Sequence, residues 1–244
     1  MSYFINKQNQ YIAYKKIEGR KPGIVFIHGY NSDMEGEKAL HIEKFAKKKK
    51  LSFLRFDCRG HGKSQGKIDD YLITDWKNDL IDMINNKTKG KQILIGSSMG
   101  GWLMMLAAKS KKLKIAGLIG IAAAPDFTAE LLKNLPQRNK KELIKKNITT
   151  IKKWGVKYIF TRKFFIDGRK NFVTNKKFIF SKPIILLHGT KDDIVPLTVP
   201  QNFLNKVKNR NIQLRILKNS DHRLSKKNDL KNISNALENM LSII

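Results

Sequence analysis

Residues 93–109 read Ile-Leu-Ile-Gly-Ser-Ser-Met-Gly-Gly-Trp-Leu-Met-Met-Leu-Ala-Ala-Lys, and this stretch decides the fold. A short apolar run at 93–95, typical of a buried strand, leads directly into a G-x-S-x-G motif at 96–100 and then into a helical run. In this motif the serine lies on a sharp turn from strand to helix, where glycines avoid Cβ clashes. We therefore expect Ser98 at the carboxyl edge of a sheet, at a helix N-terminus that favours negative charge.

Similar short apolar runs recur on both sides of the motif, as expected for buried parallel strands. They lie at 24–27, 53–56, 117–122 and 184–187, with an alternating sixth strand expected at 212–217, after an opening hairpin at 3–6 and 10–15. Stretches with helical spacing of apolar residues lie between and after them, at 35–48, 74–84, 99–109 and 229–244. This alternation predicts an α/β fold with a mostly parallel central sheet and helices on both faces.

The alternation breaks between residues 126 and 182. This segment has helical pieces such as 142–153 and an aromatic cluster: Trp154, Tyr158, Phe160, Phe164, Phe165 and Phe172. A structureless loop of this length would be unusual in a compact domain, so we predict a helical lid at 126–182 within a single domain spanning 1–244. The alternative is an excursion that simply packs on the flank of the domain.

The composition excludes several classes of protein. Cys58 is the only cysteine, so the chain can form neither an internal disulfide nor a cysteine-rich metal site. Because no His, Asp or Glu cluster has metal-ligand spacing, we expect no metal and no cofactor. The longest uncharged stretch, 92–108, is too short and too rich in Gly and Ser for a transmembrane helix. Residues 1–16 resemble neither a signal nor a transit peptide, so we expect a cytoplasmic protein.

A formal net charge of +29 would ordinarily suggest polyanionic partners. However, only 9 of the 49 basic residues are Arg, the residue that makes bidentate contacts to bases and phosphates. The basic residues are also scattered, without interleaved aromatics. We attribute the charge to surface composition in an AT-rich genome and expect no specific nucleic-acid partner. Nothing in the sequence indicates the oligomeric state.

Two later segments supply the acid and the base that a serine nucleophile needs. Residues 188–196 read His-Gly-Thr-Lys-Asp-Asp-Ile-Val-Pro, and residues 220–222 read Ser-Asp-His. The order Ser, Asp, His matches the order that accompanies this motif. We therefore predict Ser98 as nucleophile and His222 as base. The spacing D-x-x-V-P selects Asp192 as the acid, and we expect Asp193 to hydrogen-bond backbone amides of its own turn.

A tetrahedral oxyanion needs two N–H donors. The amide after the nucleophile, that of Met99, is one candidate. The second is the amide of Tyr30, because it lies in the turn after the first parallel strand, where Gly29 permits a tight path. We expect His28, in the same turn, to be structural.

With these residues assembled, the chain resembles the α/β-hydrolase superfamily over essentially its whole length. Four segments more narrowly resemble the abhydrolase-domain group of mitochondrial palmitoyl-protein thioesterases and its bacterial relatives: 54–57 (LRFD), 96–104 (GSSMGGWLM), 187–196 (LHGTKDDIVP) and 220–223 (SDHR). The resemblance implies hydrolysis of acyl thioesters on protein cysteines, and of acyl-glucuronides or other carboxylic esters, by Ser98, Asp192 and His222. It thins across 126–182, where acyl-chain specificity would be set. The missing transit peptide departs from the mitochondrial members and suggests a bacterial cytosolic protein.

Two other functions remain open at this point. A peptidase or a C–C hydrolase would use the same three residues. A non-catalytic α/β scaffold could instead bind anionic partners through its positive surface, although the complete set of Ser98, Asp192 and His222 argues against it.

Overall fold

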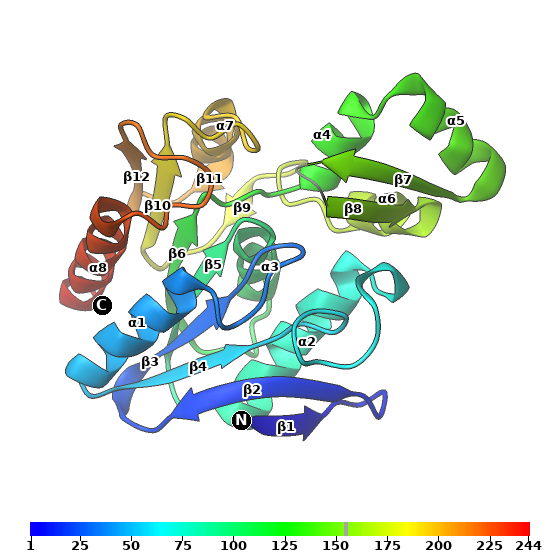
Figure 1. Ribbon diagram of the computed structural model, residues 1–244. Coiled ribbons are helices and arrows are strands. Elements are labelled where there is room, and N and C mark those ends of the chain that lie inside the picture. The colour runs from blue at the N-terminus through cyan, green and yellow to red at the C-terminus, as the bar shows by residue number, and fades with distance from the viewer. Residues whose placement is uncertain (154–155) are drawn as a thin grey trace.

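The computed structural model describes residues 1–153 and 156–244 (Figure 1). Its strands are β1 (Ser2–Ile5), β2 (Tyr11–Ile17), β3 (Arg20–Ile27), β4 (Leu51–Phe56), β5 (Gln92–Ser97), β6 (Ile115–Ile121), β7 (Ile148–Lys153), β8 (Val156–Thr161), β9 (Phe178–Ile179), β10 (Ile184–Gly189), β11 (Val207–Lys208) and β12 (Ile212–Leu217). Its helices are α1 (Glu37–Lys48), η1 (Ile68–Asp70), α2 (Ile73–Lys87), α3 (Met99–Ala108), α4 (Phe127–Asn134), α5 (Gln137–Lys146), α6 (Arg162–Lys170), α7 (Thr198–Lys206) and α8 (Lys227–Ser242).

The central sheet has eight strands in the order β1-β2-β4-β3-β5-β6-β10-β12. The six strands from β4 to β12 are parallel, whereas β1 and β2 form an antiparallel hairpin whose second strand pairs antiparallel with β4. β5 and β6 are buried along their whole length because helices cover both of their faces. Their continuous apolar runs are the sequence signal that predicted them.

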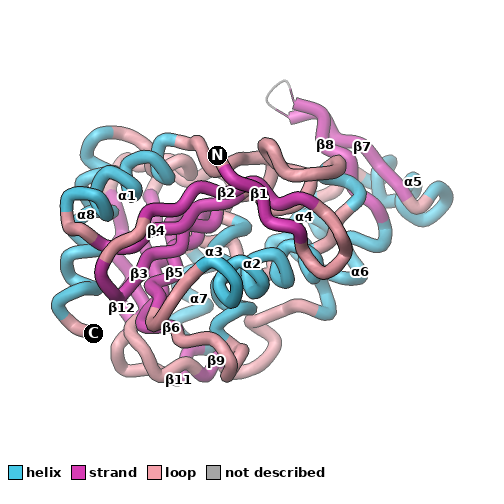
Figure 2. Tube along the Cα trace, turned by 90° about the horizontal axis from the view of Figure 1, so that it is seen from below, coloured by secondary structure: helices cyan, strands magenta, loops and turns pink. Residues whose placement is uncertain are grey.

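Helices cover both faces of this sheet (Figure 2). α1 and α8 lie on one face, where Ile42 of α1 and Leu237 of α8 join the core. α2 and α3 cover the other, where Trp76 and Trp102 are fully buried. The predicted α/β class, the parallel strands and the four flanking helices are therefore confirmed. α7 and the short parallel pair β9 and β11 were not predicted from the sequence.

Residues 126–182, here called the inserted segment, contain α4, α5, α6, an antiparallel hairpin of β7 and β8, and the short strand β9. The predicted helix over 142–153 is therefore wrong beyond Lys146. Asn147 adopts a left-handed conformation with φ of 59°, which ends α5, and the β-branched residues 148–151 that follow favour a strand. Trp154 of the predicted aromatic cluster lies outside the described residues.

Hydrogen bonds close the base of the inserted segment and tie it to the rest of the chain. The carboxylate of Asp126 accepts the backbone N–H groups of Val173 and Thr174, both at 2.8 Å, so the start of the segment is joined to a later part of it. Asp167 accepts from Thr74 of α2, and the indole of Trp102 donates to the carbonyl of residue 171. α5, β7 and β8 project away from the sheet (Figure 2). Within the described residues, none of the helices combines the length and apolar character needed to cross a bilayer.

Candidate active site

The turn between β5 and α3 places Ser98 at the carboxyl edge of the sheet. Ser98 has φ of 51° and ψ of −117°, a conformation that an L-residue adopts only at a cost in strain. The residues two positions before and after it must be glycines, because a Cβ on Gly96 would clash with the carbonyl of Gly100, and a Cβ on Gly100 would clash with the carbonyl of Ile27. The motif therefore exposes the hydroxyl at the N-terminus of α3.

The structure brings Ser98, Asp192 and His222 together from three separate loops. Nε2 of His222 lies 3.1 Å from Oγ of Ser98, and Nδ1 lies 2.8 Å from Oδ2 of Asp192. With the proton on Nδ1, the imidazole donates to the carboxylate and accepts from the serine hydroxyl. This is the hydrogen-bond order of a Ser-His-Asp triad.

The carboxylate of Asp192 is held by both of its oxygens. Oδ1 accepts the backbone N–H groups of Ile194 at 3.0 Å and Val195 at 2.8 Å, and the side chain is 1% exposed. Burial acts to raise the pKa of Asp192, but the hydrogen bond and charge of His222 together with the two amides outweigh it, so the pKa lies below its ordinary value. The carboxylate that fixes this turn is therefore Asp192 itself. The expectation that Asp193 would do so is wrong. Asp193 is exposed, and the amides of Ile194 and Val195 donate to Asp192 instead.

A second histidine, His188, lies against the same carboxylate, a contact that was not predicted from the sequence. Its Nε2 lies 2.8 Å from the carbonyl oxygen of Val195 and 3.4 Å from Oδ2 of Asp192. Among the described residues its Nδ1 is buried without a partner. In the sequence, this contact was indicated only by the place of His188 near the end of a predicted strand, four residues before Asp192. His188 therefore ties the loop of Asp192 to the strand that precedes it.

The loop after β3 passes close to Ser98. A Cβ on Gly29 would lie only 3.3 Å from Cβ of Ser98, so the lack of a side chain lets the backbone of this loop pass close to Ser98. Over residues 1–153 and 156–244, the amides of Tyr30 and Met99 donate to no protein acceptor. His28 lies behind the loop, where it is buried between the carbonyl of Gly29 and the amide of Cys58, and burial lowers its pKa. His28 is thus structural, as predicted.

Aromatic side chains connect this loop to the inserted segment. The ring of Tyr30 packs against Phe160 at 5.8 Å, Phe164 at 6.0 Å and Tyr158 at 6.4 Å between centroids. These contacts bring together much of the aromatic cluster that the sequence singled out. The cluster forms packing between the loop of Tyr30 and the inserted segment.

A groove of about 570 Å³ opens beside the triad, between α4 and α7. Its apolar lining includes Ala124, Phe127, Val195 and Val199. The amide of Ala124 donates to the carbonyl of Ser98, so the groove begins next to the nucleophile motif. The rest of the lining is polar and includes Asp126, Glu130, Thr174 and Lys206. The site therefore adjoins a groove of mixed character that is large enough for an acyl chain.

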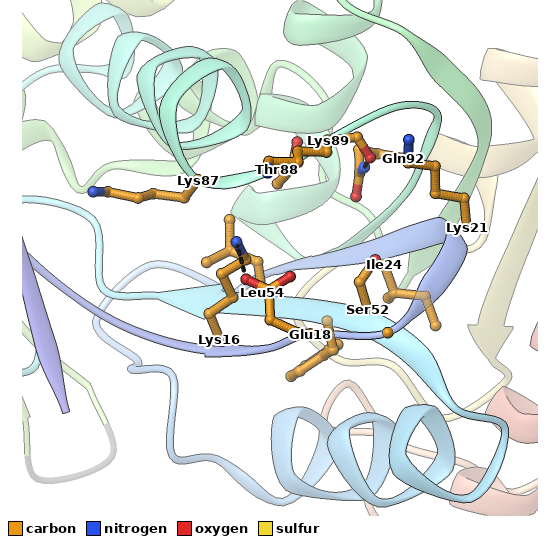
Figure 3. Close-up of a pocket in the computed structure, with 12 residues that line it drawn as sticks. Lys16, Glu18, Lys21, Ile24, Ser52, Leu54, Lys87, Thr88, Lys89 and Gln92 are labelled. Carbon is orange, nitrogen blue, oxygen red and sulfur yellow. Dashed lines mark hydrogen bonds and ion pairs between the residues drawn. The ribbon is translucent and has the colours of Figure 1, made fainter.

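A smaller hollow of about 100 Å³ lies at the opposite edge of the sheet (Figure 3). It is lined from the beginnings of β3, β4 and β5, and four lysines line it together with Glu18, which pairs with Lys16 at 2.6 Å. Because the triad lies at the carboxyl ends of the strands, this hollow is separate from it.

The fold and the Ser98 site together define a serine hydrolase of the α/β-hydrolase class. Residues 19–167 match the Hydrolase_4 family model, described as serine aminopeptidase, S33, and the chain belongs to this family. Human palmitoyl-protein thioesterase ABHD10, mitochondrial, is 35% identical over 237 residues, which cover 94% of this chain and 76% of the human protein. The corresponding Bos taurus protein is 34% identical over 233 residues, again covering 94% and 76%.

Solved structures agree with this assignment. Alpha/beta hydrolase domain-containing protein 10 from mouse superposes with a TM-score of 0.92 at 31% identity, covering 99% of this chain and 98% of the mouse chain. A putative hydrolase from Agrobacterium vitis S4 gives the same TM-score at 28% identity, with 98% and 97% covered. The resemblance to the palmitoyl-protein thioesterase group and to a bacterial relative is therefore confirmed.

Proposed function

We propose that this serine hydrolase cleaves carboxylic thioesters and esters through an acyl-enzyme, and that S-acylated proteins are its preferred substrates. The observation that carries the proposal is the continuous hydrogen-bond chain from Asp192 through His222 to Ser98. A serine hydroxyl is a weak nucleophile until a base accepts its proton, and this chain provides the base in the required tautomer.

In the acylation step, Oγ of Ser98 forms a bond to the carbonyl carbon while its proton passes to Nε2 of His222. The resulting imidazolium is stabilised by the ionised carboxylate of Asp192. When the tetrahedral intermediate collapses, the bond from carbon to sulfur or oxygen breaks, and His222 returns the proton to the departing thiolate or alkoxide. Ser98 is left acylated.

Deacylation repeats the sequence with water as the nucleophile. His222 removes a proton from water, the hydroxide attacks the acyl carbon, and the proton then goes to Oγ of Ser98 as the fatty acid leaves. The same three residues therefore serve both halves of the reaction and are regenerated, and one water is consumed in each turnover.

The amides of Tyr30 and Met99 are proposed to stabilise the oxyanion in both steps. Two features support this role. Both amides lack a protein acceptor among the described residues, and Gly29 brings the backbone of the Tyr30 loop close to Ser98. Preorganised N–H donors of this kind lower the barrier by stabilising charge that develops only in the transition state.

The groove between α4 and α7 is proposed to hold the acyl chain, and the inserted segment is proposed to act as its lid. Phe127, Val195 and Val199 give the groove an apolar wall, and α4 contributes both to this wall and to the inserted segment. The thioester preference follows the printed function of the mammalian relatives, palmitoyl-protein thioesterases. The cytoplasmic, bacterial setting predicted from the sequence stays part of the proposal, although those relatives are named as mitochondrial.

A peptidase is the second candidate, because the matching family model is described as a serine aminopeptidase. Glu130 and Asp126 line the same groove, and a carboxylate there could receive the α-amino group of a peptide. Peptide p-nitroanilides tested beside thioesters distinguish the two activities.

Fluorophosphonate labelling of the wild type and of Ser98→Ala is the decisive first experiment. We expect labelling of the wild type alone, followed by faster cleavage of S-acyl peptides than of matched p-nitrophenyl esters or anilides. Equal labelling of Ser98→Ala would remove Ser98 from the mechanism. A preference for anilides over thioesters would replace the thioesterase with the peptidase.

A further inference from the structure

The face of the inserted segment directed away from Tyr30 carries two adjoining grooves of about 390 and 450 Å³. Both are lined by Leu132 of α4 and Phe165 of α6. Phe164, the neighbour of Phe165, packs instead against Tyr30, so α6 presents different faces to the triad side and to these grooves. The first groove shares no lining residue with the proposed acyl groove, and the second shares only Ala129 with it.

The apolar side chains around these grooves protrude from the surface. Ile144 is 73% exposed, Ile166 is 47% exposed and Leu132 is 40% exposed, and each comes from a different helix. Isolated exposed apolar residues are common, but a cluster contributed by three helices is typical of an interaction surface. We call this cluster, with Leu143 and Phe165 beneath it, the apolar face.

All charged residues that line the two grooves are cations. Lys140, Arg162 and Arg169 line the first groove, and Lys133, Lys140 and Arg169 line the second, with no Asp or Glu in either lining. Within residues 1–153 and 156–244, none of these four forms an ion pair. Their long aliphatic stems can lie along the apolar face while their charged ends reach outward.

Positive charge is concentrated in this part of the chain. Residues 126–182 contain 16 Lys and Arg against 4 Asp and Glu, a net charge of +12 in 57 residues, compared with +29 in all 244. Three of the nine Arg residues of the chain lie here, and Arg162 and Arg169 border the apolar face. Surface composition explains an abundance of lysine, but it does not explain an apolar face enclosed by unpaired cations.

We propose that the apolar face, with Lys133, Lys140, Arg162 and Arg169 around it, docks on an anionic phospholipid bilayer. Protruding isoleucine and leucine side chains would enter the boundary between headgroups and acyl chains, and the surrounding cations would bind lipid phosphates. Arg is suited to this contact because its guanidinium pairs with phosphate through two hydrogen bonds.

Charge complementarity favours a bilayer over a second copy of the chain. A symmetric dimer through this face would bring two surfaces of net positive charge together, whereas anionic headgroups neutralise them. An acidic protein would match the charge, but protruding apolar side chains gain more from a bilayer, into which they can insert without a preformed pocket.

Docking through this face does not depend on the chemistry of Ser98, so it can be measured on the inactive Ser98→Ala protein. Sedimentation with vesicles of phosphatidylcholine alone, and of phosphatidylcholine with phosphatidylglycerol, reports the partition coefficient. We expect binding only to the anionic vesicles, and a decrease as salt is raised. Arg162→Gln with Arg169→Gln should lower the partition coefficient about 30-fold, given the usual contribution of each cation near an anionic surface. Ile144→Ser should lower it about 10-fold.

Matched variants elsewhere on the surface separate docking by this face from attraction to overall charge. Ile179, on β9, is 74% exposed, and Ile179→Ser is the control for Ile144→Ser. Lys208→Gln with Arg210→Gln removes two exposed charges far along the chain from the apolar face. These controls should bind as tightly as the parent.

Three outcomes would overturn the proposal. The first is equal weakening by the control and groove variants, which would mean nonspecific attraction. The second is an absence of binding to anionic vesicles. The third is self-association in sedimentation velocity that Ile144→Ser abolishes, which would assign the face to a second copy. Circular dichroism and thermal melting of each variant confirm that it is folded.

Discussion

Asp192 contacts His222 through only one of its carboxylate oxygens. Oδ2 lies 2.8 Å from Nδ1 of His222, while Oδ1 accepts the amides of Ile194 and Val195. One oxygen therefore orients the imidazole and the other fixes the carboxylate. A substitution of Asp192 that removes one of these contacts also disturbs the other, because both depend on the same buried carboxylate.

Asp192→Asn should lower kcat about 10⁴-fold, whereas Asp193→Asn should change it less than about 2-fold. The amide presents an N–H group or a weaker acceptor to His222 and no longer favours the tautomer in which Nε2 accepts from Ser98. Asp193, the next residue in the chain, is exposed and provides a matched control. Steady-state hydrolysis of a p-nitrophenyl ester measures both. A larger loss in Asp193→Asn would exchange the two roles.

The low pKa of Asp192 predicts how stability depends on pH. Since the pKa in the folded protein lies below the ordinary value of 3.8, the unfolded state binds a proton more readily in this range. The stabilising contribution is therefore fully present above about pH 4 to 5 and is lost as pH falls through the folded pKa. Urea unfolding of the wild type and Asp192→Asn from pH 7 to 3 should show a difference that is constant at first and then shrinks. A difference that grows toward pH 3 would contradict the assigned direction of the shift.

Ser98→Gly should stabilise the protein while abolishing turnover. Ser98 has φ of 51°, and glycine adopts this conformation without the strain of about 1–3 kcal/mol that other residues incur. After the greater entropy of glycine in the unfolded chain is subtracted, a net gain of about 0.5–2 kcal/mol is expected. Ser98→Ala keeps the Cβ and should leave stability nearly unchanged.

Ser97→Gly is the control for this effect. Ser97 lies in β5, where glycine should destabilise by about 0.5–1 kcal/mol. If both glycine variants shift the free energy of unfolding in the same direction, strain at Ser98 is not its cause.

The sequence predicted those parts of the molecule in which local pattern and fold agree. Buried parallel strands such as β5 are continuous apolar runs, and the G-x-S-x-G motif admits only the sharp turn that the structure has at Ser98. The order Ser98, Asp192, His222 matched the order that accompanies this motif, and the three residues were expected to meet because strand ends converge at one edge of a sheet.

The inserted segment was less predictable because its structure depends on few local signals. The end of α5 rests on one left-handed residue, Asn147, and the strands that follow it are stabilised by pairing with each other. The contact between His188 and Asp192 was also missed, since a histidine at a strand end has no distinctive pattern. Asp192 rather than Asp193 fixes its turn for a reason of geometry, the direction of one buried carboxylate, that spacing alone does not encode.

Asp126→Asn should loosen the base of the inserted segment without removing the triad. The carboxylate accepts from the amides of Val173 and Thr174 and from the hydroxyl of Thr174, so it joins residues 48 positions apart. Asparagine retains one acceptor oxygen but places an NH₂ group opposite one of these donors, which should cost about 1.5–3 kcal/mol.

The same change should alter substrate use, because Asp126 also lines the groove beside Ser98. We expect KM for long-chain acyl thioesters to rise more than KM for acetyl esters, with fluorophosphonate labelling of Ser98 retained. Glu130→Gln, in the same groove but exposed, is the matched control and should leave the melting temperature unchanged. Limited proteolysis should cut Asp126→Asn faster within 126–182 than the control. If chain-length preference and protease sensitivity stay at wild-type levels while stability falls, Asp126 is a structural carboxylate only, and the inserted segment does not control access to the groove.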